Sequence, residues 1–213
     1  MRENLTEKNK RVLKIIEIFK QVYKDADCTL DYMSPLQLLI ATQLAAQCTD
    51  ARVNMVTPAL FKRYPTVYDF ARADPDELSA LIHSTGFYRN KTKNIIACCK
   101  KLISDFNGEV PKTMDELLSL PGVGRKTANL VLGDCFGIPG IVVDTHAGRL
   151  ARRMGLTKNT DPYKVELDLV KIVPPEEQSN FCHCLVFHGR EFCDARKPDC
   201  LGCPISEICP KIL

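Results

Sequence analysis

The sequence predicts a mainly α-helical protein, and three observations support this fold class. Ser34 and Pro35 are the residue types expected at the cap and the first position of a helix. Only residues 141–143 look extended, and a stretch that short does not imply a sheet. One helix face near the N-terminus is marked by apolar residues at helical spacing: Val12, Ile15, Ile16, Phe19, Val22 and Tyr23.

Turn-forming pairs divide the middle of the chain into several short helices. These pairs are Thr57-Pro58, Tyr64-Pro65, Asp74-Pro75 and Asn107-Gly108. Residues 113–119 and 125–135 are expected to form two further helices, the second one stronger in apolar content. A crossing between two lobes is expected at 137–140, where a proline lies between glycines.

Length and composition are those of an ordinary globular protein. The chain has 213 residues, of which 45% are hydrophobic and 26% are charged. The first ten residues lack the apolar core of a secretory signal, and the most apolar stretch, 36–46, is short and interrupted by polar residues. Neither export nor a membrane span is therefore expected. The net charge of +3 permits a nucleic-acid partner without requiring one.

Eleven cysteines without an export signal indicate a reducing cytosol rather than a disulfide scaffold. Seven of them are scattered and are expected to be small buried side chains: Cys28, Cys48, Cys98, Cys99, Cys135, Cys182 and Cys184. The last four follow the pattern Cys-x6-Cys-x2-Cys-x5-Cys in a proline-rich loop: Cys193, Cys200, Cys203 and Cys209. Four thiolates so close together are typical of a metal site, and their spacing alone fits either zinc or an iron–sulfur cluster.

Two glycines, Gly122 and Gly124, lie one residue apart between two predicted helices. They allow left-handed backbone angles and leave bare N–H groups at the positive end of a helix that begins at Arg125. That arrangement suits a backbone phosphate, but a tight turn with glycines for geometry alone fits the spacing equally. Lys126 follows just inside the helix. The helix dipole and burial favour its neutral, nucleophilic form, whereas taken alone it fits a surface charge or a phosphate contact.

Asp144 lies where the extended stretch passes into a helix, and it is expected to be the N-cap, a role that requires no chemistry. The helix dipole also keeps such a carboxylate ionised. Beside an amine nucleophile, an ionised carboxylate takes a proton or stabilises the cation that forms on a sugar as a base leaves. His146 is expected to be packed or to touch a phosphate rather than to act as a second base.

Three motifs together resemble the endonuclease III family of the helix-hairpin-helix DNA glycosylase superfamily. They are LPGVGRKTAN at 120–129, VDTH at 143–146 and the 6-2-5 cysteine spacing, and the resemblance covers nearly the whole chain. It implies an all-α, two-lobed fold: a six-helix domain at 28–138 faces a cluster domain made of 1–27 and 139–213. It also implies that the four cysteines of the 193–209 loop hold a structural [4Fe-4S] cluster.

The resemblance further implies a base-excision-repair enzyme that acts as a monomer on double-stranded DNA with damaged bases or abasic sites. It would turn a damaged base out of the duplex and remove oxidised pyrimidines. Lys126 would attack the sugar C1′ with help from Asp144, and the abasic strand would then break by β-elimination. The expected location is the cytoplasm, at the nucleoid of a prokaryotic cell.

The family segments that fill the vacated space in DNA correspond to LAAQCTD at 44–50 and STGFYRNK at 84–91. They provide Gln47 and Phe87, the latter at a position where the family often has leucine. From the residues alone, Gln47 fits an exposed polar position on a helix and Phe87 a core aromatic beside a turn. The other expected DNA contacts are Lys91, Gly122, Val123, Gly124, Arg125 and His146.

Related activities are the alternatives. A monofunctional adenine glycosylase shares the cluster and the aspartate but lacks lysine at position 126 and has an extra C-terminal domain. A mismatch thymine glycosylase usually lacks that lysine as well. A non-catalytic DNA-binding module with a zinc loop explains the hairpin and the cysteines but not Lys126 together with Asp144. The lysine, and the end of the chain four residues after Cys209, favour the bifunctional enzyme.

Overall fold

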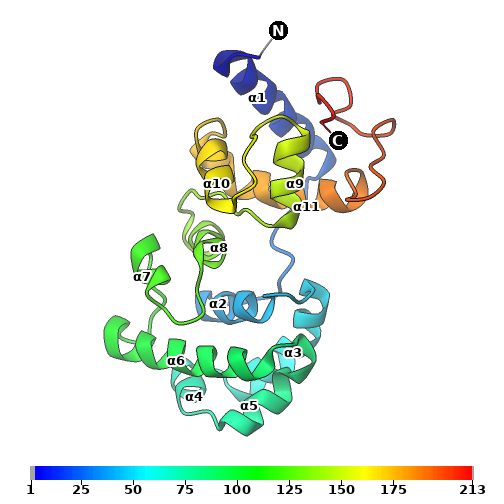
Figure 1. The fold of residues 1–213 in the computed structure, drawn as a ribbon. Helices are drawn as coiled ribbons and strands as arrows, with labels where there is room; N and C mark the ends of the chain where they lie inside the picture. The colour runs from blue at the N-terminus through cyan, green and yellow to red at the C-terminus, as the bar shows by residue number, and fades with distance from the viewer. Residues whose placement is uncertain (1–2, 213) are drawn as a thin grey trace. The chain divides into compact units, whose positions relative to one another are not determined.

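The computed structural model describes residues 3–212, and all regular secondary structure in that range is helical (Figure 1). The predicted all-α fold class is confirmed. The chain divides into two compact units, named here the terminal unit (Met1–Asp27 with Ile138–Leu213) and the middle unit (Cys28–Gly137). No helix between residues 3 and 212 combines the length and the apolarity needed to cross a membrane.

The longest helix of the middle unit is α6 (Tyr88–Phe106), which packs against α2, α4 and α5. The other elements of this unit are α2 (Pro35–Leu44), α3 (Asp50–Arg63), α4 (Val67–Ala71), α5 (Pro75–Ile82), the 3₁₀ turn η1 (His83–Thr85), α7 (Met114–Leu118) and α8 (Arg125–Phe136). The predicted start of α2 is confirmed, because Pro35 is its first residue and the Ser34 hydroxyl accepts a hydrogen bond from the Gln37 N–H at 3.3 Å.

One predicted helix boundary in the middle unit is wrong. Helix α3 continues through Pro58, although Thr57-Pro58 was expected to end a helix. Proline removes one backbone hydrogen bond, but Val53, five residues before it, and Leu60, two residues after it, are fully buried and hold the helix to the core. The other three turn-forming pairs do mark helix ends: Tyr64 and Asn107 are C-caps, and Asp74 is an N-cap.

The terminal unit is formed by α1 (Leu5–Val22), α9 (Thr145–Arg153), α10 (Pro162–Val170), the 3₁₀ turn η2 (Pro175–Glu177) and α11 (Gln178–Glu191). Five of the six residues predicted for the apolar face of α1 are buried, and Phe19 stacks on Phe181 of α11 with ring centroids 6.0 Å apart. Val22 is 44% exposed because, at about 100° per residue, it falls at the edge of the stripe centred near Phe19 and Tyr23.

The scattered cysteines follow the expectation in part. Cys98, Cys99, Cys182 and Cys184 are buried, and burial raises the pKa of the Cys98 and Cys184 thiols to about 11. The three remaining scattered cysteines, Cys28, Cys48 and Cys135, are half-buried rather than part of the core.

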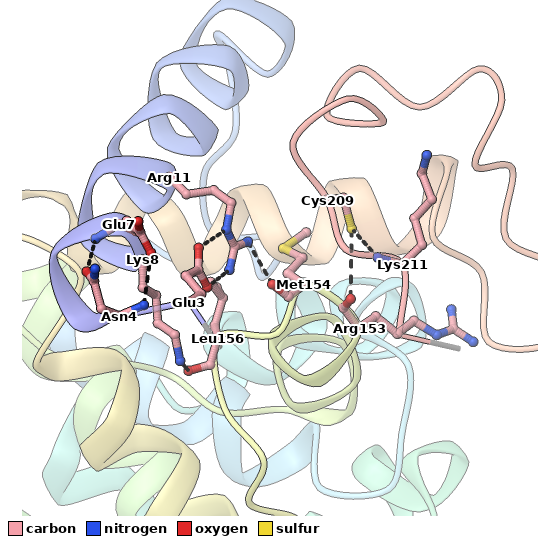
Figure 2. Close-up of polar contacts among 10 residues, drawn as sticks. All are labelled: Glu3, Asn4, Glu7, Lys8, Arg11, Arg153, Met154, Leu156, Cys209 and Lys211. Atoms are coloured by element: carbon pink, nitrogen blue, oxygen red, sulfur yellow. Dashed lines mark hydrogen bonds and ion pairs between the residues drawn. The ribbon is translucent and has the colours of Figure 1, made fainter. Parts of the chain in front are cut away.

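Side chains at the start of α1 hold the turn that follows α9 (Figure 2). The Arg11 guanidinium donates to the Glu3 carboxylate at 2.7 and 2.8 Å and to the Met154 carbonyl at 2.8 Å. The end of the cysteine loop contacts the same turn, since the Cys209 thiol lies 3.8 Å from the Arg153 carbonyl. The N-terminal helix and the C-terminal loop therefore share one support within the terminal unit.

Candidate functional site

The turn between α7 and α8 contains one glycine that the backbone requires. Gly122 has φ of +77°, and a Cβ there would lie 2.7 Å from Gln43 Oε1 and 2.9 Å from Asn94 Cβ. Gly124 has φ of −107° and open space around its Cα, so the expectation of a left-handed angle is wrong for this residue. Backbone angle and packing therefore require glycine at position 122 but not at position 124.

Gly124 is the N-cap of α8, and no side chain caps this helix end. By contrast, Ser34, Thr49 and Asp144 each accept a backbone N–H at the starts of their helices. The first N–H groups of an uncapped helix are donors for a bound anion, and the helix dipole favours negative charge there. A bare Gly124 therefore supports the phosphate-binding hypothesis over a purely geometric turn.

Gly122→Ala is expected to destabilise the protein by about 1–3 kcal/mol, because alanine resists the positive φ and its Cβ overlaps Gln43 and Asn94. Gly124→Ala is the matched control and should cost less, because alanine is a poorer N-cap than glycine but meets no positive φ and no overlap at this position. Chemical denaturation of both variants measures the difference. Equal destabilisation by the two substitutions would contradict the assignment of different roles to the two glycines.

Lys126 is the second residue of α8 and its side chain is exposed, directly after the uncapped turn. Arg125 is half-buried, and Val123 is 9% exposed and packs inward. An exposed lysine at this place is free to reach a sugar bound alongside the phosphate that the turn would hold. The position thus combines the uncapped N–H groups at the start of α8 with an amine two residues after Gly124.

Asp144 is the N-cap of α9, as predicted. Its Oδ1 accepts the Ala147 N–H at 2.7 Å, and the side chain is half-buried. That bond fixes the orientation of the carboxylate and leaves the second oxygen, Oδ2, for another role. His146, two residues further on, has its Nδ1 3.2 Å from Nη2 of Arg149.

Helix α9 also holds the beginning of the cysteine loop. Arg149 donates to the Cys193 carbonyl from Nε and Nη2 at 3.2 and 3.0 Å. Arg153 donates to the carbonyls of Asp194 and Ala195 at 2.6 and 2.8 Å. One nine-residue helix therefore has Asp144 at its start and supports the loop near its end. Sequence analysis missed this function of the two arginines, because an arginine-rich helix end is also expected simply from the helix dipole.

The four C-terminal cysteines are half-buried and line one apolar cavity with Met154 and Ile205. Between residues 3 and 212, no three His, Cys, Asp or Glu side chains converge closely enough to hold a single metal ion. The Cys203 thiol lies 3.5 Å from His188 Nε2, and burial raises the pKa of Cys203 and Cys209. The four thiols thus share one cavity.

Gln47 and Phe87 are both exposed and both left-handed, with φ of +54° and +48°. Gln47 lies in the turn after α2, not on a helix, and Phe87 is 63% exposed at the N-cap of α6, not in the core. The core position considered for Phe87 is therefore wrong, and Gln47 is exposed as considered but lies on a turn rather than a helix. A left-handed non-glycine residue costs about 1–2 kcal/mol, and strain of this kind clusters at functional sites.

Lys91 lies inside the middle unit. It is 5% exposed, and its Nζ donates to the Leu44 carbonyl at 2.7 Å and the Thr85 carbonyl at 2.8 Å. Burial lowers the pKa of Lys91. The Lys91 ammonium therefore binds two backbone carbonyls of the protein itself, a role that the sequence did not indicate.

The middle unit brings together Lys126, the glycine turn, Gln47, Phe87 and Lys91, and the terminal unit holds Asp144, His146 and the cysteines. Beneath the glycine turn, the structure adds the buried amide of Gln43, which sequence analysis did not single out. A polar residue in the apolar segment of α2 was the available signal.

Comparison with known proteins agrees with this arrangement. The model of the HhH-GPD superfamily, base excision DNA repair proteins, matches residues 40–175. Endonuclease III of Synechocystis sp. is 53% identical over 97% of the chain and 94% of that protein, and endonuclease III of Escherichia coli is 42% identical over 84% and 85%. A solved structure of a trapped endonuclease III–DNA covalent intermediate superimposes with a TM-score of 0.90 at 44% identity, covering 95% of this chain and 96% of that one.

These similarities define the class of protein. The chain belongs to the HhH-GPD superfamily of base excision DNA repair proteins and, within it, to the endonuclease III family. Members of that family are enzymes, and the activity of this chain is accordingly that of a base-excision DNA glycosylase and abasic-site lyase. A thermostable thymine-DNA glycosylase shares the fold, with a TM-score of 0.85 at 22% identity.

Proposed function

We propose that this enzyme removes oxidised pyrimidines from duplex DNA and then cleaves the abasic strand through a Schiff base on Lys126. The observation that carries the proposal is an exposed lysine at the second position of α8, directly after an uncapped glycine turn. The turn would bind a backbone phosphate and hold the adjoining sugar within reach of Nζ.

The chemistry follows from an amine and a carboxylate acting on one sugar. The neutral Lys126 amine forms a bond to C1′ as the bond from C1′ to the base breaks, and the base leaves with the electron pair and takes up a proton. Asp144 would accept the proton that the amine loses, and its charge would stabilise the cationic sugar. The nitrogen lone pair then forms the C=N bond of a protonated imine as the C1′–O4′ bond breaks and O4′ takes up a proton. Loss of a C2′ proton then expels the 3′ phosphate.

Gln47 and Phe87 would occupy the space that the extruded base leaves. Both side chains are exposed on turns, and their strained backbone angles indicate that their direction matters. An exposed aromatic side chain can unstack neighbouring bases, and a polar amide can pair with the orphaned base. We expect the enzyme to act as a monomer on damaged or abasic duplex DNA, in the cytoplasm at the nucleoid.

Cys193, Cys200, Cys203 and Cys209 would hold a [4Fe-4S] cluster. The four thiols are half-buried and line one cavity, and four cysteine thiolates are the usual ligands of such a cluster, in which each iron takes one cysteine. The cluster would have a structural role, joining the C-terminal loop to the support provided by α1 and α9.

Metal analysis tests this assignment. Purified protein is expected to be brown, with about four irons and four acid-labile sulfides per chain. Cys203→Ser should lower the iron content and the thermal unfolding temperature, while Cys135→Ser, a half-buried cysteine of the middle unit, should change neither by a comparable amount. A colourless protein with one zinc per chain would contradict the cluster.

Borohydride trapping tests the proposed activity. A labelled duplex that carries one thymine glycol is incubated with the protein and borohydride, which reduces an imine to a stable amine. A covalent protein–DNA band establishes the Schiff base together with base removal. Base release without a band from active protein would make the enzyme a monofunctional glycosylase.

A further inference from the structure

We propose that Lys91 is a positioning residue that sets the spacing of Gln47 and Phe87, so that both enter the DNA as one unit. The inference rests on the proposed function of these two side chains. Its structural basis is a single buried ammonium bound to the carbonyls at the two helix ends from which their turns emerge.

The sequence separates the two turns widely, and Lys91 joins them. Its Nζ donates to the carbonyl of Leu44, three residues before Gln47, and to the carbonyl of Thr85, two residues before Phe87. Both bonds are buried, at 2.7 and 2.8 Å. A movement of either turn would therefore break a hydrogen bond at a site where water does not replace it.

The carbonyls of Leu44 and Thr85 lie at helix ends, where a carbonyl has no hydrogen-bond donor within its own helix. Leu44 is the last residue of α2, and Thr85 is the last residue of η1. The last carbonyls of a helix lack an internal partner and lie at the negative end of its dipole, so a lysine ammonium suits both positions. Lys91 thus fixes the two helix ends from which the turns emerge.

The left-handed angles explain why such an anchor is needed. Besides Gln47 and Phe87, the non-glycine residues with positive φ in the described chain are Asn107, at a helix C-terminus, and Lys211, in the C-terminal tail. A phenylalanine with φ of +48° and 63% exposure gains little from its own packing. Strained backbone conformations persist where the surrounding structure holds them. The two hydrogen bonds of Lys91 lie within three residues of Gln47 and Phe87, so they can hold both strained residues in place.

The test compares a substrate that requires the two side chains with one that does not. Lys91→Met keeps the length of the side chain and removes its donors. It is expected to slow thymine glycol excision from duplex DNA by about 100-fold, the scale of a misplaced binding group. Trapping on a single-stranded oligonucleotide with an abasic site, which has no stacked base to extrude or space to fill, should remain unchanged.

Two further variants complete the experiment. Lys91→Arg retains donors for the two carbonyls and should restore part of the duplex activity. Lys100→Met removes an exposed lysine of the same helix and should leave duplex activity as it is. In the Gln47→Ala, Phe87→Ala background, Lys91→Met should cause no further loss, because nothing remains to be positioned.

The outcomes separate the inference from the proposed function. Equal loss on both substrates, in step with a lower unfolding temperature, would make Lys91 a core residue and overturn the inference. Wild-type duplex activity in Lys91→Met would overturn it as well. If the wild-type protein itself traps neither substrate, the proposed Schiff-base activity has failed.

Discussion

Lys126→Gln is expected to abolish strand cleavage and borohydride trapping, with a loss of at least about 1000-fold, or about 4 kcal/mol of transition-state stabilisation. Glutamine has a similar length but no amine that can form an imine. The side chain is exposed and forms no part of the core, so the fold and most of the DNA-binding interface should survive. Single-turnover cleavage of an abasic duplex, together with a binding titration, measures both effects.

The control for this variant is Lys62→Gln, which removes one exposed positive charge from α3 of the same unit. A charge effect on DNA binding would appear in both variants, whereas loss of the nucleophile would appear only in Lys126→Gln. Nicking of abasic DNA by Lys126→Gln at the wild-type rate would show that another amine forms the Schiff base.

Local signals in the sequence were sufficient where a structural feature depends on neighbouring residues. The Ser34 cap, Pro35 at the first helical position and the Asp144 cap are set by hydrogen bonds within three residues, so the sequence predicts them correctly. Pro58 is the opposite case. Its local preference is to end a helix, and burial of Val53 and Leu60 in the core outweighs that preference.

The candidate site also depends on contacts that no local pattern contains. Lys91 is bonded to a carbonyl 47 positions away, so a lysine that was expected to contact DNA lies in the interior. Gln43 and Asn94 come from two helices and meet only beneath Gly122. The left-handed angles of Gln47 and Phe87 have no signature in residue type, because both residues ordinarily avoid that region.

For the motif residues, the resemblance to a known family and the geometry of the structure supply different information. The residue types and their places allowed a nucleophilic lysine and an assisting carboxylate, and the resemblance assigned these roles to Lys126 and Asp144. Both roles stay predictions. Geometry adds that packing does not require glycine at position 124, since nothing near its Cα excludes a side chain. It also adds the arginines of α9, which connect the helix of Asp144 to the loop of the four cysteines.

Asp144→Asn is expected to slow base removal by about 100- to 10,000-fold, the range for loss of a positioned acid–base or electrostatic group. Asparagine is as good an N-cap as aspartate and keeps an oxygen for the Ala147 N–H. Only the interaction of the charge with the helix dipole is lost, which costs about 0.3–1 kcal/mol of stability. The substitution therefore separates the chemical role from the capping role within one residue.

The matched control is Asp161→Asn at the start of α10, where the aspartate accepts the Lys164 N–H at 3.0 Å in the same capping geometry. Both variants should lose the same small amount of stability in chemical denaturation, and only Asp144→Asn should lose excision of thymine glycol in single-turnover assays. If Asp144→Asn excised the base as fast as the Asp161→Asn protein, Asp144 would be a helix cap and nothing more, and the carboxylate that assists Lys126 would have to be another one.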